Sequence, residues 1–161
     1  MSEYNRVVIE AGSKKVFATA IDWPGWSRAG KDEAGALEAL SAYAERYRRV
    51  ADLTGSGSLP ETFTVIERLE GSGAIDFGVP DRVAEADRES MSDAECERQV
   101  GLLRACWRVF DDIASSVSAE LRKGPRGGGR DRDKIIDHVV QADRGYGRQI
   151  GVRPPPFDSF D

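Results

Sequence analysis

Histidine and cysteine are scarce in this sequence, and their scarcity limits its chemistry. The 161 residues include one histidine, His138, and two cysteines, Cys96 and Cys106. A catalytic zinc needs about three protein ligands, and a nucleophilic serine needs a base within reach. No complete metal site or catalytic constellation can be assembled, so no catalytic residue is predicted. The cysteines lie about 15 Å apart along one predicted helix, too far for a disulfide, and we expect reduced, partly buried thiols.

Long apolar runs are also missing. The start, MSEYNRVVIEAG, has no signal-peptide core, and no segment is apolar enough to predict a transmembrane helix. The net charge of −5 and the pI of about 5.1 give no support to a nucleic-acid or membrane partner. We therefore expect a cytoplasmic protein, with a modest core because 32% of its residues are charged.

The first half of the chain predicts a small β/α unit. Apolar residues at 7–9 and 16–21 predict two strands joined by a turn, which together form an antiparallel hairpin. Apolar residues at helical spacing predict one helix over 32–53. A third strand is predicted over 63–69, and a short extended piece over 74–77.

The second half has helical periodicity. A helix is predicted from Ser92 to Lys123, with Ser92 and Glu95 as a capping box. One apolar row of this helix consists of Cys96, Val100, Leu103, Trp107, Phe110, Ala114, Val117 and Leu121. A flanking row consists of Leu102, Cys106, Val109 and Ile113. A single neighbour would not cover both rows, so partners are expected on two sides.

A second helix is predicted over 131–150, with Gly151 as its C-cap. The resulting fold class is α+β, in two parts. Residues 1–80 form a small antiparallel β-β-α-β unit. Residues 81–161 form a long antiparallel two-helix hairpin with a proline-rich tail.

Two stretches of the chain resemble known families. Asp22-x-Pro24-Gly25, followed by Gly30 and the helix start at 32–37, resembles the D-x-P-G turn and the helix entry of HicB-like antitoxins. Asp32 stands where those antitoxins usually have Ser or Thr. The resemblance implies a β-β-α-β unit and an antitoxin-like protein partner, but their C-terminal DNA-binding segment has no counterpart here.

Residues 92–152 resemble the DinB-like family of four-helix bundles, which includes thiol-dependent transferases and the mycothiol-dependent maleylpyruvate isomerase domain. The match lies in His138-Val139-x-x-Ala142-Asp143-x-x-Tyr146. It implies half of a bundle, with His138 as the first of three histidines that bind a divalent metal such as zinc or nickel. The other two come from a later helix as H-x-x-x-H, and this sequence has no second histidine. The two parts together resemble actinobacterial proteins, usually longer, that join such units.

Three features are candidate sites, each with a structural alternative. His138 is a metal ligand completed by another chain, or a helix histidine packed against a neighbour. The two tryptophans of the turn, Trp23 and Trp26, form a ligand or partner surface, or they close over the end of the sheet. A basic glycine-rich loop before the second helix binds a small anion or an acidic cofactor, or is a solvated loop with Asp131 or Asp133 as the helix cap. Nucleic acid is a further alternative for this loop that the net charge disfavours. Its candidate residues are Arg126, Gly127, Gly128, Gly129, Arg130 and Arg132.

The sequence favours a non-catalytic binding or regulatory protein with a small anionic ligand at the basic loop. The alternative is a metal- or thiol-dependent transferase that is complete only with ligands from another chain or from further sequence. A third possibility is antitoxin-like partner binding through the first half. The wide apolar face from Cys96 to Leu121 either packs on the first half of the chain or is covered by a second copy. We expect a homodimer, because two hairpins together would complete a four-helix bundle.

Overall fold

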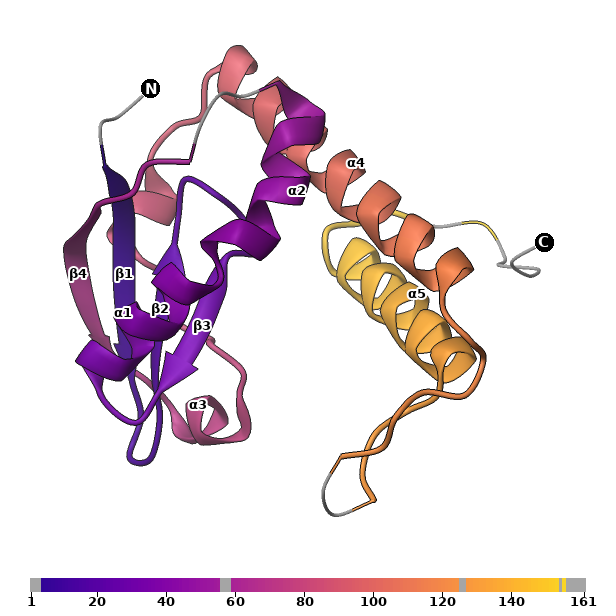
Figure 1. Cartoon of the computed structure of the whole chain (residues 1–161). Helices are drawn as coiled ribbons and strands as arrows, with labels where there is room; N and C mark the ends of the chain where they lie inside the picture. The colour runs from indigo at the N-terminus through magenta and orange to yellow at the C-terminus, as the bar shows by residue number, and fades with distance from the viewer. Residues whose placement is uncertain (1–3, 56–58, 125–126, 154, 156–161) are drawn as a thin grey trace. The chain divides into compact units, whose positions relative to one another are not determined.

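The computed structural model describes residues 4–55, 59–124, 127–153 and 155. Within these residues the fold is mixed α+β, with one four-stranded sheet and five α-helices (Figure 1). The chain forms two compact units, Met1–Val109 and Phe110–Asp161, and each is described here by itself. The division falls inside helix α4 (Asp93–Ser116) rather than after residue 80, because the first half of α4 contributes to the core of the first unit.

The sheet has the strand order β3-β2-β1-β4. Its strands are β1 (Asn5–Ala11), β2 (Val16–Ala20), β3 (Ser27–Gly30) and β4 (Phe63–Glu70). The predicted hairpin of β1 and β2 is confirmed, and β3 continues it as an antiparallel neighbour of β2. The predicted all-antiparallel sheet is wrong, since β4 lies parallel to β1. Helices cross over between β3 and β4, and a parallel pair requires such a crossover.

The predicted single helix over 32–53 is two helices, α1 (Glu33–Ala42) and α2 (Ala44–Thr54). The Asp32 side chain caps α1 by accepting a hydrogen bond of 2.8 Å from the Gly35 N–H. At Tyr43 the backbone has ψ near −9°, and its N–H donates to the carbonyl of Leu40 three residues back, so the chain changes direction there. Gly55, at φ +64°, ends α2 in the left-handed conformation.

The main core of the first unit lies between the sheet and these helices, which cover one face of the sheet in Figure 1. Val7 and Ile9 of β1 pack there with Leu40 of α1. Trp26 fills the centre: its indole N–H donates to the Leu40 carbonyl at 2.9 Å, and its ring stacks on Tyr47 with centroids 5.4 Å apart. Burial raises the pKa of Tyr47, whose hydroxyl donates to a backbone carbonyl.

The opposite face of the sheet is covered by residues 71–91. The predicted extended piece at 74–77 is wrong, because the segment forms the short helix α3 (Gly73–Phe77), which begins where the Ser72 hydroxyl accepts from the Ala74 N–H. A 3-10 turn follows at Glu85–Arg88. Glu10 of β1 is buried on this face and accepts hydrogen bonds from the backbone N–H groups of Asp81 and Arg82. A β1 carboxylate therefore ties this segment to the sheet.

Helix α4 ends at Ser116, seven residues before the predicted end at Lys123. Only half of the predicted capping box forms: the Ser92 hydroxyl accepts from the Glu95 N–H at 3.2 Å, whereas the Glu95 carboxylate binds Arg98. Helix α5 (Arg132–Gln149) and its glycine cap match the prediction, with Gly151 at φ +81°. No described residue of α5 is buried, and its antiparallel pairing with α4 stays a prediction.

The core of the first unit is the expected partner on one side of α4 and covers the flanking apolar row: Leu102 is buried, and Cys106 and Val109 pack against the core. The other row is exposed among the described residues, with exposed fractions of 41% for Val100, 48% for Leu103 and 45% for Trp107, so a partner on that side stays a prediction. Spacing predicts that both rows are apolar, but the position of the neighbouring core decides which one is buried.

Acid should weaken the anchor between the first hairpin and α3. The Ser13 hydroxyl and the backbone N–H of Lys14 donate to the Asp76 carboxylate and lower its pKa. A lowered folded pKa stabilises the protein above the unfolded value of about 3.9, and this contribution is lost as the pH falls through the folded pKa. In urea titrations at several pH values, the free energy of unfolding should fall more steeply below about pH 4 for the native chain than for Asp76→Asn.

The control is Asp52→Asn, because the exposed Asp52 carboxylate accepts no hydrogen bond from the described residues. This variant should follow the pH dependence of the native chain. If Asp76→Asn also follows it, the anchor does not contribute to stability.

Candidate functional site

The basic glycine-rich loop lies in the second unit. Arg126 falls outside the described residues, whereas Gly127, Gly128, Gly129 and Arg130 are exposed. The Gly124 N–H donates to the Gly128 carbonyl at 2.7 Å and closes a tight turn. Among the described residues, these exposed groups do not converge on an anion site. The anion site predicted at this loop therefore stays a prediction.

Arg132 of the same loop has partners of its own. Its guanidinium donates to the Asp133 carboxylate at 2.8 Å and to the Val117 carbonyl at 3.3 Å. Asp131 stands at the N-cap of α5, but its carboxylate does not cap the helix. Instead it accepts from the Leu121 N–H and pairs with Lys123.

His138 is exposed on α5. Within residues 4–55, 59–124, 127–153 and 155, no group of three histidine, cysteine, aspartate or glutamate side chains lies close enough to hold a metal ion. The described donor set therefore does not fit the metal centre that the DinB-like resemblance implies. Metal binding by His138 would need ligands from outside the described residues.

Trp23 and Trp26 do not form an exposed surface. Trp26 has no solvent-exposed area and Trp23 is 4% exposed, because both rings pack against Tyr47. The predicted ligand or partner surface is therefore wrong, and both rings belong to the core between the sheet and the helices. The Arg98 guanidinium lies over the Trp23 ring at 5.4 Å.

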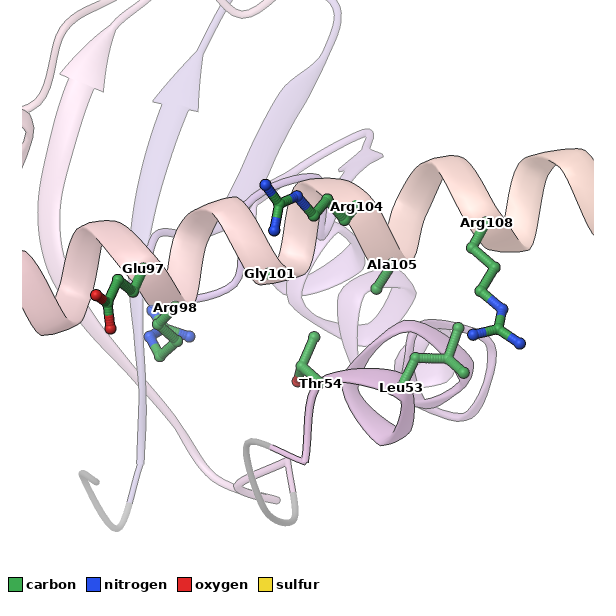
Figure 2. A pocket seen from close by; sticks show the side chains of 8 residues that line it. All are labelled: Leu53, Thr54, Glu97, Arg98, Gly101, Arg104, Ala105 and Arg108. Atoms are coloured by element: carbon green, nitrogen blue, oxygen red, sulfur yellow. The ribbon is translucent and has the colours of Figure 1, made fainter.

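A hollow beside α4 in the first unit is lined by charged residues that the sequence did not single out, with the Arg104 and Arg108 side chains pointing apart in Figure 2. It has a volume of about 360 Å³ and lies between the end of α2 and the first half of α4. Its lining residues are Leu53, Thr54, Glu97, Arg98, Gly101, Arg104, Ala105 and Arg108. In Figure 2, Arg98 and Arg108 stand at the two ends of this hollow, with Leu53 and Thr54 across from α4.

The sequence of α4 explains why this face is open. Residues 97, 101, 104 and 108 follow steps of four, three and four, so they share one side of the helix. Gly101 stands in the middle of that side, and a Cβ atom built on it would meet no other atom within 4 Å. The missing side chain leaves free space at the centre of the hollow.

Arg98 is held in place by its neighbours. Its guanidinium makes two hydrogen bonds with the Glu95 carboxylate, at 2.7 and 2.8 Å, and donates to the Asp22 carbonyl at 2.6 Å. The pair lowers the pKa of Glu95 and raises the pKa of Arg98. Arg98 therefore lines the hollow in a fixed position, and its positive charge is balanced by Glu95.

Arg104 and Arg108 differ from Arg98. Both are exposed, and neither makes an ion pair or a hydrogen bond with the described part of the chain. Because Glu95 balances Arg98, these two arginines against the single Glu97 leave a formal charge of +1 on the rest of the lining, although the whole chain carries −5. The hollow is thus a local basic site on an acidic protein.

A second hollow, of about 270 Å³, adjoins the other side of Arg98. Its charged groups are paired with one another: the Arg6 guanidinium binds the Asp22 carboxylate at 2.7 Å, which raises the pKa of Arg6, and Arg98 binds Glu95. The Arg6–Asp22 pair joins β1 to the turn after β2, and Arg98 joins that turn to α4 through the Asp22 carbonyl. The charged groups of the second hollow are therefore balanced by one another.

No family model, curated protein sequence or solved structure matches this chain. Among the described residues, no helix combines the length and the apolar composition needed to cross a bilayer.

Replacing Gly101 by alanine should stabilise the helix while it fills the hollow. Glycine inside a helix costs about 0.5–1 kcal/mol relative to alanine, and the open space at Gly101 accepts the methyl group without a clash. We expect the free energy of unfolding to rise by about that amount in urea titrations followed by circular dichroism. Gly145→Ala in α5 is the matched control, since its Cβ also meets no other atom within 4 Å. A loss of stability in Gly101→Ala alone would mean that the space is not open.

Proposed function

We propose that this chain is a non-catalytic binding protein that holds an anionic group in the arginine-lined hollow of α4. One observation carries the proposal: Arg104 and Arg108 line the same hollow without a carboxylate partner in the described residues. A guanidinium presents N–H donors in a planar fork that matches a carboxylate or a phosphate. Two such groups without counter-ions would gain from binding an anion.

The dimensions and the electrostatics support this function. A volume of about 360 Å³ lies within the usual range for sites that bind small molecules or parts of larger ligands. Arg98 is prepositioned by Glu95 and by the Asp22 carbonyl, which lowers the entropy cost of ordering that side of the site. The net charge of −5 opposes the approach of an anion, so local contacts must supply the affinity.

Several expectations from the sequence remain proposals beside this one. The hairpin, the turn motif and the helix start that resemble HicB-like antitoxins support kinship of the first unit with them. The His138-to-Tyr146 motif supports kinship of α5 with DinB-like bundles and is the basis of the transferase alternative. That alternative needs two further metal ligands from outside the described residues, so no chemical step is assigned.

Removing the two unpaired arginines should weaken anion binding. Hydrogen bonds to charged groups contribute about 1.5–3 kcal/mol each, and 1.4 kcal/mol corresponds to a tenfold change in affinity. In titrations of the native chain and of the Arg104→Gln/Arg108→Gln variant with pyrophosphate, monitored by backbone amide NMR shifts, we expect at least about tenfold weaker binding by the variant. Higher salt should weaken binding by the native chain.

The matched control is Arg130→Gln/Arg148→Gln, which removes two exposed arginines from the second unit. This double variant should bind pyrophosphate as the native chain does. If it loses binding while Arg104→Gln/Arg108→Gln retains it, the basic loop is the site and the hollow is not.

We also propose that two copies of the chain associate, as the sequence predicts. The exposed apolar row of α4, with Val100, Leu103 and Trp107, is a surface whose burial would favour association. Light scattering on the native chain should give the mass of a dimer, and Trp107→Glu should shift it to that of a monomer. A native monomer at micromolar concentration contradicts this proposal and leaves the anion site unaffected.

A further inference from the structure

We propose that the anion in the hollow is carried by an acidic segment of a partner protein, and that this segment continues along α2 to a pair of arginines at Tyr43. The inference rests on the proposed function of the hollow and extends it. The additional observation is an arginine pair at the other end of α2 that has no counter-ion among the described residues.

The arginine pair lies at the break between α1 and α2. Arg28 of β3 stands over the Tyr43 ring at 4.2 Å from its centroid, and Arg46 of α2 lies 5.6 Å from the same centroid. Both side chains are exposed, and neither makes an ion pair with a described carboxylate. One aromatic ring therefore holds two like charges, and each guanidinium keeps its in-plane donors available to an anion.

One face of α2 connects this pair to the hollow. Arg46, Arg49 and Leu53 follow steps of three and four, so they lie in one row along the helix. Arg46 and Leu53 are about 10 Å apart along the axis at 1.5 Å per residue. Leu53 lines the hollow, and Figure 2 shows the Arg108 side chain reaching towards it from α4. The resulting basic track consists of Arg28, Arg46, Arg49, Arg108 and Arg104.

The acidic residues of α2 flank the middle of this row. Glu45 and Asp52 are four and three residues from Arg49, although neither makes an ion pair with it among the described residues. The track therefore presents its unpaired arginines chiefly at its two ends, at Tyr43 and at the hollow. A ligand that pairs with the whole track would carry acidic groups along a length greater than that of one small molecule.

An acidic peptide fits the track better than a nucleic acid does. Leu53 is 46% exposed within the row of arginines and offers an apolar contact to a side chain, which a phosphate backbone lacks. Single-stranded nucleic acids stack their bases on aromatic rings, and the ring of Tyr43 already carries two guanidinium groups. The net charge of −5 also opposes a long polyanion.

The test uses a fluorescent peptide of about eight residues with alternating glutamate and leucine, which spans about 26 Å when extended. Anisotropy titrations compare the native chain with Arg28→Gln/Arg46→Gln and with Arg104→Gln/Arg108→Gln. We expect each pair of substitutions to weaken peptide binding by about tenfold or more. Only the second pair should weaken pyrophosphate binding, because pyrophosphate occupies the hollow alone. Arg48→Gln, on the other side of α2, should leave both affinities unchanged.

Arg28→Lys/Arg46→Lys is a second variant that keeps the charge but removes the planar fork. It should bind the peptide with an affinity between those of the native chain and the glutamine variant, and it keeps the test valid if the glutamine variant fails to fold by circular dichroism. Unchanged peptide affinity in both Arg28/Arg46 variants overturns the track and leaves the hollow intact. No pyrophosphate binding by the native chain overturns the proposed function itself. Tighter binding of a single-stranded oligonucleotide than of the peptide overturns the assignment to a protein partner.

Discussion

Arg98 attaches the first half of α4 to the sheet. Its guanidinium binds Glu95 on its own helix, donates to the Asp22 carbonyl in the turn after β2, and lies over the Trp23 ring. Leu102 and Ala105 then bury their side chains against the same core. The hollow depends on this attachment, since one wall is α4 and the other is the end of α2. Because Arg98 fixes α4 against the turn after β2, Arg104 and Arg108 of the same helix are held beside the end of α2.

The strand that the sequence pattern missed also explains the wrong strand direction. β1, β2 and β4 were predictable because apolar residues cluster or alternate along them, but β3 has only four residues, Ser27–Gly30, without such alternation. With β3 left out, the crossover helix would return β4 antiparallel to β1. With β3 present, the same crossover makes β4 parallel. One short strand therefore sets the direction of the longest one.

The candidate site was less predictable than the fold. Arginines at 98, 104 and 108 on an amphipathic helix are typical of a solvated face. The Glu95–Arg98 pair has the i, i+3 spacing of a local contact within α4, but the bond from Arg98 to the Asp22 carbonyl and the position of the end of α2 come from tertiary structure. Gly101 was the one local sign of the site in the sequence. A glycine inside a long helix lowers stability relative to alanine, which suggests that the missing side chain has a role. Trp23 and Trp26 were candidate ligand residues because of their aromatic rings, but their side chains are buried in the core.

The absence of any buried residue among the described part of α5 has a consequence for motion. Amide hydrogens exchange with solvent when their hydrogen bonds open, and a helix with few buried apolar contacts opens at a low cost in free energy. The apolar residues of α5, such as Ile135 and Val139, are only half-buried, whereas β1 lies inside the sheet with Val7 and Ile9 buried. We therefore expect the amides of α5 to exchange with solvent faster than those of β1.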